Sequence, residues 1–245
     1  IAIPAWKIAP ALAFGNTVVF KPAELAPGSA WALTDIIARS GVPEGVFNLV
    51  MGPGAEIGAP MLNDHRIRAV SFTGSTNTGH IVAGACSARN ARYQLEMGGK
   101  NPMVVMNDAD LGIAIPACLN GAFFSTGQRC TASSRLIVTE GIHDKFVGAL
   151  AEAAANLKVG NALEAGVQMG PVVDEKQLAQ DLEYVSIAAK EGGKVLGGGR
   201  LSLASDGFYM SPALISETTN NMRINREEVF GPVLAVIPIL GAATF

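Results

Sequence analysis

The stretch that decides the fold is "GVFNLVMGPGAEIGAPMLNDHRIRAVSFTG", residues 45–74. It begins with a short apolar run typical of a strand (45–50), passes through a glycine-rich turn into a helical pattern (51–63), and ends in a second strand-like run (67–74). A strand, a helix and a strand in this order predict a β-α-β unit with parallel strands and a right-handed crossover.

The same alternation continues on both sides of this unit. A strand is predicted at 16–22 and a helix at 26–41 before it, and a helix at 75–88 and a strand at 91–97 after it. Repeated β-α-β units predict an α/β fold with a doubly wound parallel sheet. Such sheets bind ligands at the carboxyl ends of their strands.

The pattern changes after "GGKNP" (98–102), and a domain boundary is predicted there, between 1–97 and 98–245. The second part is expected to be an α/β domain of its own. Strands and helices are predicted for it at 103–107, 110–125, 135–140, 142–157 and 174–192, with further strands in "GGKVLGGG" (192–199), "PALISETT" (212–219) and "GPVLAVIPIL" (231–240).

Composition excludes several classes of protein. The 245 residues carry 18 Lys and Arg against 21 Asp and Glu, a formal charge of −3, which gives no support for a nucleic-acid or membrane-surface partner. The longest uncharged run, from Val229 to the end, is punctuated by Gly and Pro and therefore predicts a buried strand and the start of a loop, not a membrane span.

Cysteine and histidine usage argues against a disulfide framework and against a metal site. The three cysteines, Cys86, Cys118 and Cys130, are an odd number without C-x-x-C spacing, and the three histidines are scattered. A reducing, cytoplasmic compartment is therefore expected. Cys86 and Cys118 lie in helical patterns of small and apolar residues and are expected to be structural.

Two glycine-rich loops lie between a predicted strand and a predicted helix. "MGPGAEIGAP" (51–60) contains Gly54, and "FTGSTNTG" (72–79) contains Gly74 and Ser75. Glycine lets a ligand approach the backbone, and a helix N-terminus offers free N–H groups and a partial positive charge to a phosphate. The alternative is an ordinary turn followed by a Ser or Thr N-cap.

"FKPAE" (20–24) ends the first predicted strand and places Lys21 and Glu24 where a doubly wound sheet would meet a nucleotide. The carboxylate could accept from both hydroxyls of a ribose, and the ammonium could donate to the same sugar. The alternative is a surface Lys/Glu pair.

A candidate nucleophile and a candidate base lie near the predicted boundary. "AFFSTGQRCTASSRLIV" (122–138) places Cys130 beside Arg129, and "LEMGGKNP" (95–102) places Glu96 at a strand end. A nucleophilic thiol needs help to ionise, which Arg129 or a bound cation could give. Alternatively, Cys130 fills space in the core. Arg129 could steer anionic substrates or pair with a neighbour.

Five motifs together carry a family resemblance. "FKPAE", "FTGSTNTG", "LEMGGKNP", "GQRC" and "EEVFGPV" (227–233) occur in the order, and at close to the spacing, of the aldehyde dehydrogenase superfamily. The separation of Glu96 from Cys130, 34 positions, also matches that family. The resemblance runs from Ala2 to Ile239 and is greatest to the bacterial semialdehyde dehydrogenases, such as those that act on α-ketoglutaric semialdehyde.

The resemblance implies that Cys130 is the nucleophile and Glu96 the general base. The residues that it places around the dinucleotide are Lys21, Glu24, Gly54, Gly74, Ser75, Met97, Gly99, Glu228 and Phe230. Lys21 and Glu24 would hold the adenosine ribose beside Gly54, and Ser75 would contact the pyrophosphate. Glu228 would bind the nicotinamide ribose, and Phe230, Gly99 and the Met97 carbonyl would border the nicotinamide ring.

The implied reaction oxidises a small aldehyde to a carboxylate through a cysteine thiohemiacetal and a thioester. NAD is the expected cofactor because the Glu24 carboxylate would repel a 2′-phosphate, although Lys21 leaves NADP possible. In the family, one oxyanion donor is the backbone N–H of the nucleophile, and the other is an asparagine expected three residues before Ile1.

The family chain is about twice as long, so both domains are expected to be incomplete here. The full-length protein is expected to be a homodimer or homotetramer, with no nucleic-acid or membrane partner. The alternative is a catalytically inactive fragment or relative that binds a dinucleotide or acts structurally, although the intact Cys130 and Glu96 argue against a decayed site.

Overall fold

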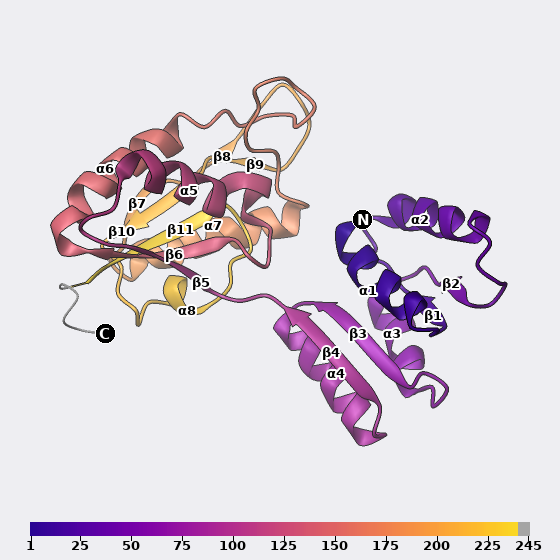
Figure 1. Cartoon of the computed structure of the whole chain (residues 1–245). Helices are drawn as coiled ribbons and strands as arrows, with labels where there is room; N and C mark the ends of the chain where they lie inside the picture. Colours follow the sequence, from indigo (N-terminus) through magenta and orange to yellow (C-terminus); the bar gives the residue numbers. More distant parts are fainter. Residues whose placement is uncertain (240–245) are drawn as a thin grey trace. The chain divides into compact units, whose positions relative to one another are not determined.

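The computed structural model describes residues 1–239 and divides the chain into two compact units, Ile1–Met97 and Gly98–Phe245 (Figure 1). Residues 240–245, at the end of the uncharged run, lie outside the described part, and the loop expected there is among them.

The first unit is built from two β-α-β pieces, and the two strands of the glycine-rich stretch, β2 and β3, belong to different pieces instead of forming one unit together. Strands β1 and β2 pair in parallel, and so do β3 and β4, with Ser71 opposite Gln94 and Thr73 opposite Glu96 in the second pair. The elements in chain order are α1 (Ala2–Ala13), β1 (Val18–Phe20), α2 (Pro27–Arg39), β2 (Phe47–Leu49), α3 (Gly54–Asn63), β3 (Ala69–Gly74), α4 (Thr76–Ala88) and β4 (Arg92–Met97).

Helix α4 shows how one of these pieces is specified locally. Ser75 is its N-cap, and the Ser75 hydroxyl accepts from the backbone N–H of Thr78 at 3.3 Å. Figure 1 shows α4 lying along β3 and β4, and its Val82 and Cys86 are buried. A Cβ at Gly79 would strike the Met97 sulfur, so the missing side chain lets the helix lie close to β4.

Helix α1 was not predicted. Its sequence, AIPAWKIAPALA, contains Pro4 and Pro10, and proline normally interrupts a helix because it lacks an N–H and its ring crowds the preceding turn. Pro4 falls in the first turn, where an N–H has no partner in the helix, so it is readily accommodated. Pro10 lies inside the helix and costs it one backbone hydrogen bond, and the helix forms despite this loss.

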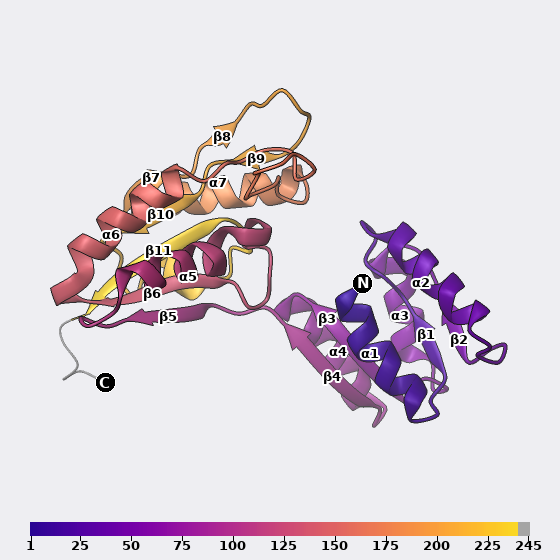
Figure 2. The ribbon, with the colours of Figure 1, turned by 45° about the horizontal axis from the view of Figure 1, so that its top comes forward.

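The second unit contains one five-stranded sheet in the order β5-β6-β11-β10-β7, in which only β7 runs antiparallel to its neighbour. Figure 2 shows β5, β6 and β11 side by side in this order. The elements are β5 (Asn101–Val105), α5 (Leu111–Phe123), η1 (Phe124–Gly127), β6 (Ser133–Thr139), α6 (Glu140–Ala155), α7 (Glu175–Lys190), β7 (Lys194–Gly197), β8 (Arg200–Leu201), β9 (Tyr209–Met210), β10 (Ala213–Ser216), α8 (Arg223–Arg226) and β11 (Val233–Ile239).

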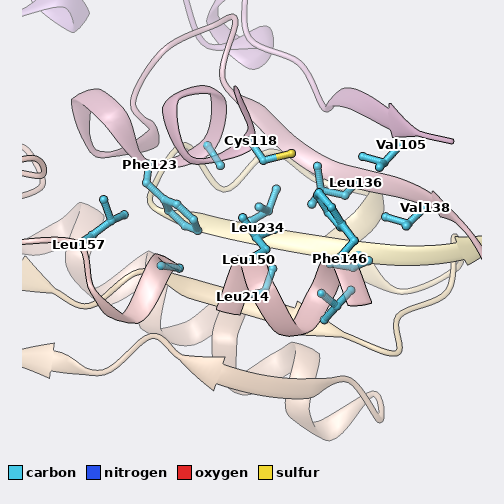
Figure 3. Packing of buried hydrophobic residues seen from close by; sticks show 14 of the residues in the cluster. Val105, Cys118, Phe123, Leu136, Val138, Phe146, Leu150, Leu157, Leu214 and Leu234 are labelled. Carbon is cyan, nitrogen blue, oxygen red and sulfur yellow. The ribbon is translucent and has the colours of Figure 1, made fainter. Parts of the chain in front are cut away.

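The two faces of this sheet bury two separate clusters. On one face, Leu214, Leu234 and Val236 pack with side chains of α5 and α6; Figure 3 shows Phe123, Phe146 and Leu150 of these helices directed at the strands. On the other face, the alternate residues of β10 and β11 pack with α7 and α8. Since successive residues of a strand point to opposite faces, the uncharged run of β11 is apolar on both sides.

The expected fold class is confirmed: the chain is mixed α/β with parallel sheets. Each predicted strand and helix of 16–192 has an observed counterpart, and so do the three strands predicted in the tail. Among residues 1–239, no helix combines the length and apolarity needed to cross a membrane.

Candidate active site

Cys130 lies in the loop between η1 and β6 and is exposed, whereas Cys86 and Cys118 are completely buried. The Asn101 side-chain amide donates to the Cys130 carbonyl at 2.7 Å and to the Ala132 carbonyl at 3.0 Å. The first residue of β5 thus fixes the backbone at Cys130 and just after it, and Cys130 itself stays exposed to solvent. Space filling in the core, the alternative for Cys130, does not fit this exposure.

The loop before Cys130 has an unusual backbone. Ser125, Thr126 and Gly127 are consecutive left-handed residues, with φ of 54°, 59° and 65°. This conformation costs a residue with a side chain about 1–3 kcal/mol, so surrounding contacts must hold it. The Thr126 hydroxyl donates to the Pro171 carbonyl at 3.3 Å, and the Gln128 side chain accepts from the Val173 N–H at 3.1 Å.

The Cys130 loop also packs against the turn that follows Glu228. A Cβ at Gly127 would collide with the Gly231 carbonyl, so the two backbones touch. Phe230 in this turn is 38% exposed and also left-handed, with φ of 61°. The turn is held by helix α7, whose Gln177 and Gln180 side-chain amides each donate to the Val229 carbonyl at 2.9 Å.

Asp181, a residue of α7, places a fully buried carboxylate beside the Phe230–Gly231 turn. A Cβ at Gly231 would overlap this carboxylate, so it packs directly against the turn. Burial raises the pKa of Asp181 to about 7, and its 2.8 Å hydrogen bond from Gln177 opposes that rise. The other carboxylate oxygen has no hydrogen-bond partner among the described residues.

Arg129, beside the thiol, points to neighbouring carbonyls. Its guanidinium donates to the carbonyls of Asn120 and Gly121 at 2.6 and 3.0 Å, near the C-terminal end of α5. Free carbonyls at a helix end attract cations. Of the two roles that the sequence left open for Arg129, pairing with a neighbour is the one that this arrangement supports.

Glu228 is held by the two glycines at the start of the second unit. The Gly99 N–H donates to the Glu228 carboxylate at 3.1 Å, and a Cβ at Gly98 would overlap that carboxylate. Lys100 follows directly. Burial, with a smaller contribution from Arg135, lowers the pKa of its ammonium to about 8, and Glu228 and Glu227 oppose this effect. Gly98 and Gly99 thus hold the Glu228 carboxylate close enough to Lys100 for the two charges to interact.

Glu96 belongs to the first unit and points to the same face of β4 as Gln94. The Gln94 amide nitrogen donates to the Glu96 carboxylate at 2.6 Å, and the Gln94 amide oxygen accepts from Lys7 at 2.9 Å and from Ser71 at 2.6 Å. Lys7 also donates to the Ser71 hydroxyl at 2.8 Å. Desolvation lowers the pKa of Lys7, and the charge of Glu96 partly offsets this.

Lys21, Glu24 and Gly54 come together at the end of β1 and the start of α3. The Glu24 carboxylate accepts from the Gly54 N–H, the first backbone N–H of α3, and Lys21 donates to the Pro22 carbonyl at 2.7 Å. A hollow opens beside them, walled by Pro22, Ala23, Glu24, Pro27, Met51, Gly52 and Pro53. Mostly apolar walls with one carboxylate, and with the Lys21 ammonium donating to the carbonyl of the wall residue Pro22, suit a nucleoside.

The second glycine loop, at the end of β3, presents Ser75 at the N-terminus of α4. A Cβ at Gly74 would collide with the Phe72 ring, so this turn depends on glycine. The Ser75 hydroxyl also lies 3.0 Å from the Thr78 hydroxyl. The arrangement offers the free N–H groups of a thirteen-residue helix to an anion, as the sequence predicted for a phosphate.

The predicted residues therefore form local groups within each unit. Lys21, Glu24 and Gly54 form one group in the first unit, and Gly99 and Glu228 another in the second. Sequence reasoning missed the side chains that hold the predicted ones: Lys7, Ser71, Gln94, Asn101 and Asp181. Only Gln94 had a visible signal, because a residue two positions before Glu96 on a strand must share its face.

No group of three or more His, Cys, Asp or Glu side chains suited to a metal ion occurs in residues 1–239. Fold and local geometry together define a two-unit α/β protein with a hollow beside Glu24 in one unit and an exposed thiol in the other.

Comparisons with known proteins agree with this class. The aldehyde dehydrogenase family model matches residues 1–242. The chain is 44% identical over 242 residues to the α-ketoglutaric semialdehyde dehydrogenase of Bacillus subtilis. The aligned region is 98% of this chain and 50% of that protein. The chain is also 44% identical over 235 residues to a betaine aldehyde dehydrogenase of Cereibacter sphaeroides, with 96% and 48% coverage.

Solved structures agree as well. The betaine aldehyde dehydrogenase of Staphylococcus aureus in complex with NAD⁺ is similar with a TM-score of 0.94 and 37% identity, over 97% of this chain and 48% of that one. The chain belongs to the aldehyde dehydrogenase family. It spans about half the length of the curated relatives that it matches.

Proposed function

We propose that the full-length protein is an NAD-dependent aldehyde dehydrogenase that oxidises an aldehyde to a carboxylate. The observation that carries this proposal is the exposure of the Cys130 thiol on a loop held at several points, in a chain of this family whose other two cysteines are buried. A nucleophile must be reachable and fixed, and only Cys130 of the three cysteines meets both conditions.

In the proposed reaction, the Cys130 thiolate attacks the aldehyde carbon and forms a carbon–sulfur bond, which gives a thiohemiacetal. Negative charge develops on the former carbonyl oxygen, and backbone N–H groups of the loop held by Asn101 are suited to receive it. Bound NAD would accept the hydride that leaves the same carbon. Cys130 is then left as a thioester.

Glu96 completes the reaction by accepting a proton from water as the water attacks the thioester carbon. The carbon–sulfur bond breaks, the carboxylate product leaves, and the Cys130 thiolate is regenerated. A thioester is more reactive toward water than an oxygen ester, so one correctly placed carboxylate is a sufficient base for this step.

The residues present fit NAD as the cofactor. Glu24 lines the hollow of the first unit, and with Lys21 and the backbone of Gly54 beside it would hold the adenosine; Ser75, after Gly74, would meet the pyrophosphate. Glu228 would bind the nicotinamide ribose, with Met97, Gly99 and Phe230 beside the ring. The Glu24 carboxylate favours NAD over NADP, because it would repel a 2′-phosphate.

We propose α-ketoglutaric semialdehyde as the first substrate to test, because relatives at 43–44% identity are named as dehydrogenases of this compound or of 2,5-dioxopentanoate. Betaine aldehyde is the second, since other relatives of 42–44% identity are named for it. The two compounds carry opposite charges, so their relative kcat/KM values separate the two assignments.

The proposal is tested by rapid mixing of the full-length protein, NAD and the semialdehyde. We expect a burst of NADH followed by slower turnover. Cys130→Ser should abolish both phases, and Glu96→Gln should keep the burst and slow the turnover by about 10²–10⁴-fold. Cys86→Ala, a change at a buried cysteine, serves as control. Normal turnover of the serine variant would show that Cys130 is not the nucleophile.

The alternative is a non-catalytic relative that binds a dinucleotide. Two measurements distinguish it from the enzyme. Calorimetric titration with NAD would then show heat of binding, while mixing with either aldehyde would form no NADH. Intact Cys130 and Glu96, in a chain that belongs to this family, favour the enzyme.

We further propose that the full-length protein acts in the cytoplasm as a homodimer or homotetramer. Three free cysteines suit a reducing compartment. Light scattering of the full-length protein measures the assembly, and a monomer at working concentration would contradict it.

A further inference from the structure

We propose that Gln94 is a positioning residue that orients Glu96 for the hydrolysis of the thioester. This inference rests on the proposed function and adds to it a specific residue, on the same strand as the base. Within the first unit, Glu96 accepts a hydrogen bond from Gln94, and the structure shows why that bond has a fixed direction.

The two side chains are held on one face of the β3–β4 pair. Gln94 and Glu96 are two positions apart on β4, and Gln94 lies opposite Ser71 on β3. Opposed residues on neighbouring strands are close enough for their side chains to interact. Lys7 reaches the same face from α1 and donates to the Ser71 hydroxyl at 2.8 Å and to the Phe72 carbonyl at 3.2 Å.

These contacts determine which way the Gln94 amide faces. The Gln94 oxygen accepts from the Lys7 ammonium at 2.9 Å and from the Ser71 hydroxyl at 2.6 Å. An ammonium only donates, so the amide must turn its oxygen toward Lys7 and its NH₂ away from it. The NH₂ group therefore faces Glu96, where it donates to one carboxylate oxygen at 2.6 Å.

This arrangement leaves the base with one occupied oxygen and one available oxygen. Oε1 of Glu96 is bound by Gln94, and Oε2 accepts no hydrogen bond from the residues that the structure describes. A general base works best when a third group fixes its orientation, because the proton must be accepted along one direction. Gln94 supplies that orientation, and Oε2 is the oxygen left to accept the proton of water.

The test compares two variants of the full-length protein. Gln94→Met keeps the length of the side chain and removes the donor to Glu96. Gln94→Glu keeps an acceptor for Lys7 and Ser71 but replaces the donor with a second carboxylate. Arg92→Leu is the matched control, because Arg92 is an exposed polar residue on the same face of β4 whose side chain makes no hydrogen bond or ion pair within residues 1–239.

The readout separates the two chemical phases. Rapid mixing with NAD and α-ketoglutaric semialdehyde measures the NADH burst, which precedes hydrolysis, and the steady-state rate that follows. We expect both Gln94 variants to keep the amplitude and rate of the burst and to lose about 10-fold or more in kcat, because a misplaced base slows only the step in which it acts. Arg92→Leu should match the unaltered protein in both phases.

Two outcomes would overturn the inference. Unchanged kcat in both Gln94 variants would show that Glu96 needs no such partner, and equal losses of burst and turnover would show a general structural role for Gln94. If the unaltered protein formed no NADH with either aldehyde, the proposed function itself would fail, which is a different result from a failure confined to the variants.

Discussion

Among single residues, Asp181 shows most clearly how burial opposes the ionisation of a side chain. Its carboxylate is fully buried against the Phe230–Gly231 turn and receives one hydrogen bond, from Gln177. An ionised carboxylate in such a place is disfavoured, so burial raises the pKa of Asp181 to about 7. In the unfolded chain the same group titrates near 3.9.

The sign of the resulting pH dependence follows from these two pKa values. Between about pH 4 and pH 7, the unfolded chain releases the Asp181 proton and the folded protein keeps it, so the free energy of unfolding falls as pH rises and then levels off. Asp181→Asn cannot ionise and avoids this loss. We expect its stability advantage to be larger at pH 8 than at pH 5 by about 2–3 kcal/mol.

Urea unfolding of the 245-residue chain at both pH values measures this difference. Asp108→Asn, a change at an exposed carboxylate, is the control and should show no such trend. If Asp181→Asn and the unaltered chain kept a constant difference between pH 5 and pH 8, Asp181 would not titrate in this range.

At the scale of elements, the loop that carries Cys130 is held by backbone contact. Gly127 ends η1 with φ of 65°, and a Cβ there would collide with the carbonyls of Gly231 and Ala122. Backbone atoms cannot move aside as a flexible side chain would. The segment before the thiol and the turn after Glu228 therefore have a fixed mutual distance, set by a residue without a side chain.

Gly127→Ala should accordingly destabilise the 245-residue chain by about 2–4 kcal/mol, from overpacking and from a left-handed conformation that alanine disfavours. Gly148→Ala is the matched control. Gly148 lies inside α6, and a Cβ there meets no atom within 4 Å, so alanine should stabilise the helix by about 0.5–1 kcal/mol. Thermal unfolding of the two variants gives the comparison, and equal effects would contradict this account.

The elements differ in how visible they were in the sequence. Strands β3 and β11 and helix α4 were predicted because their apolar spacing, their glycines and the Ser75 cap act locally. Helix α1 was missed because Pro4 and Pro10 conceal a helical pattern. Left-handed Ser125 and Thr126 were missed because nothing in these residue types indicates a positive φ, which here follows from tertiary contacts.

In the candidate site, too, some features were visible in the local sequence and others depend on tertiary contacts. Predicted groupings such as Lys21 with Glu24 and Gly54 follow from positions at strand ends and helix starts, which the sequence reveals. The partners that hold Glu96 and the Phe230 turn come from segments distant along the chain. Lys7 reaches Gln94 across 87 positions, and Gln177 reaches Val229 across 52. Pairing over such distances depends on the fold, and no local pattern predicts it.

At the scale of the whole molecule, the buried apolar residues are distributed unequally. Within residues 1–239, the first unit contributes only Ile8, Ala30, Val82 and Cys86 to the buried apolar set. The second unit contains both large clusters, one on each face of its sheet. Because burial of apolar area is the main favourable contribution to folding, most of the stability of this chain should reside in the second unit.

Hydrogen exchange of the 245-residue chain measures this difference directly. Amides of β6, α6 and β11 should exchange only through opening of the second unit, whereas amides of α1–α4 should exchange through local opening of lower free energy. After correction for intrinsic rates, the amides of α1–α4 should exchange at least about 10²-fold faster. Phe146→Ala removes a fully buried ring of α6 and should cost about 3–5 kcal/mol. It should therefore accelerate exchange in the second unit and leave the first unchanged, because the two units have separate cores. Equal acceleration in both units would instead show that they unfold as one cooperative body.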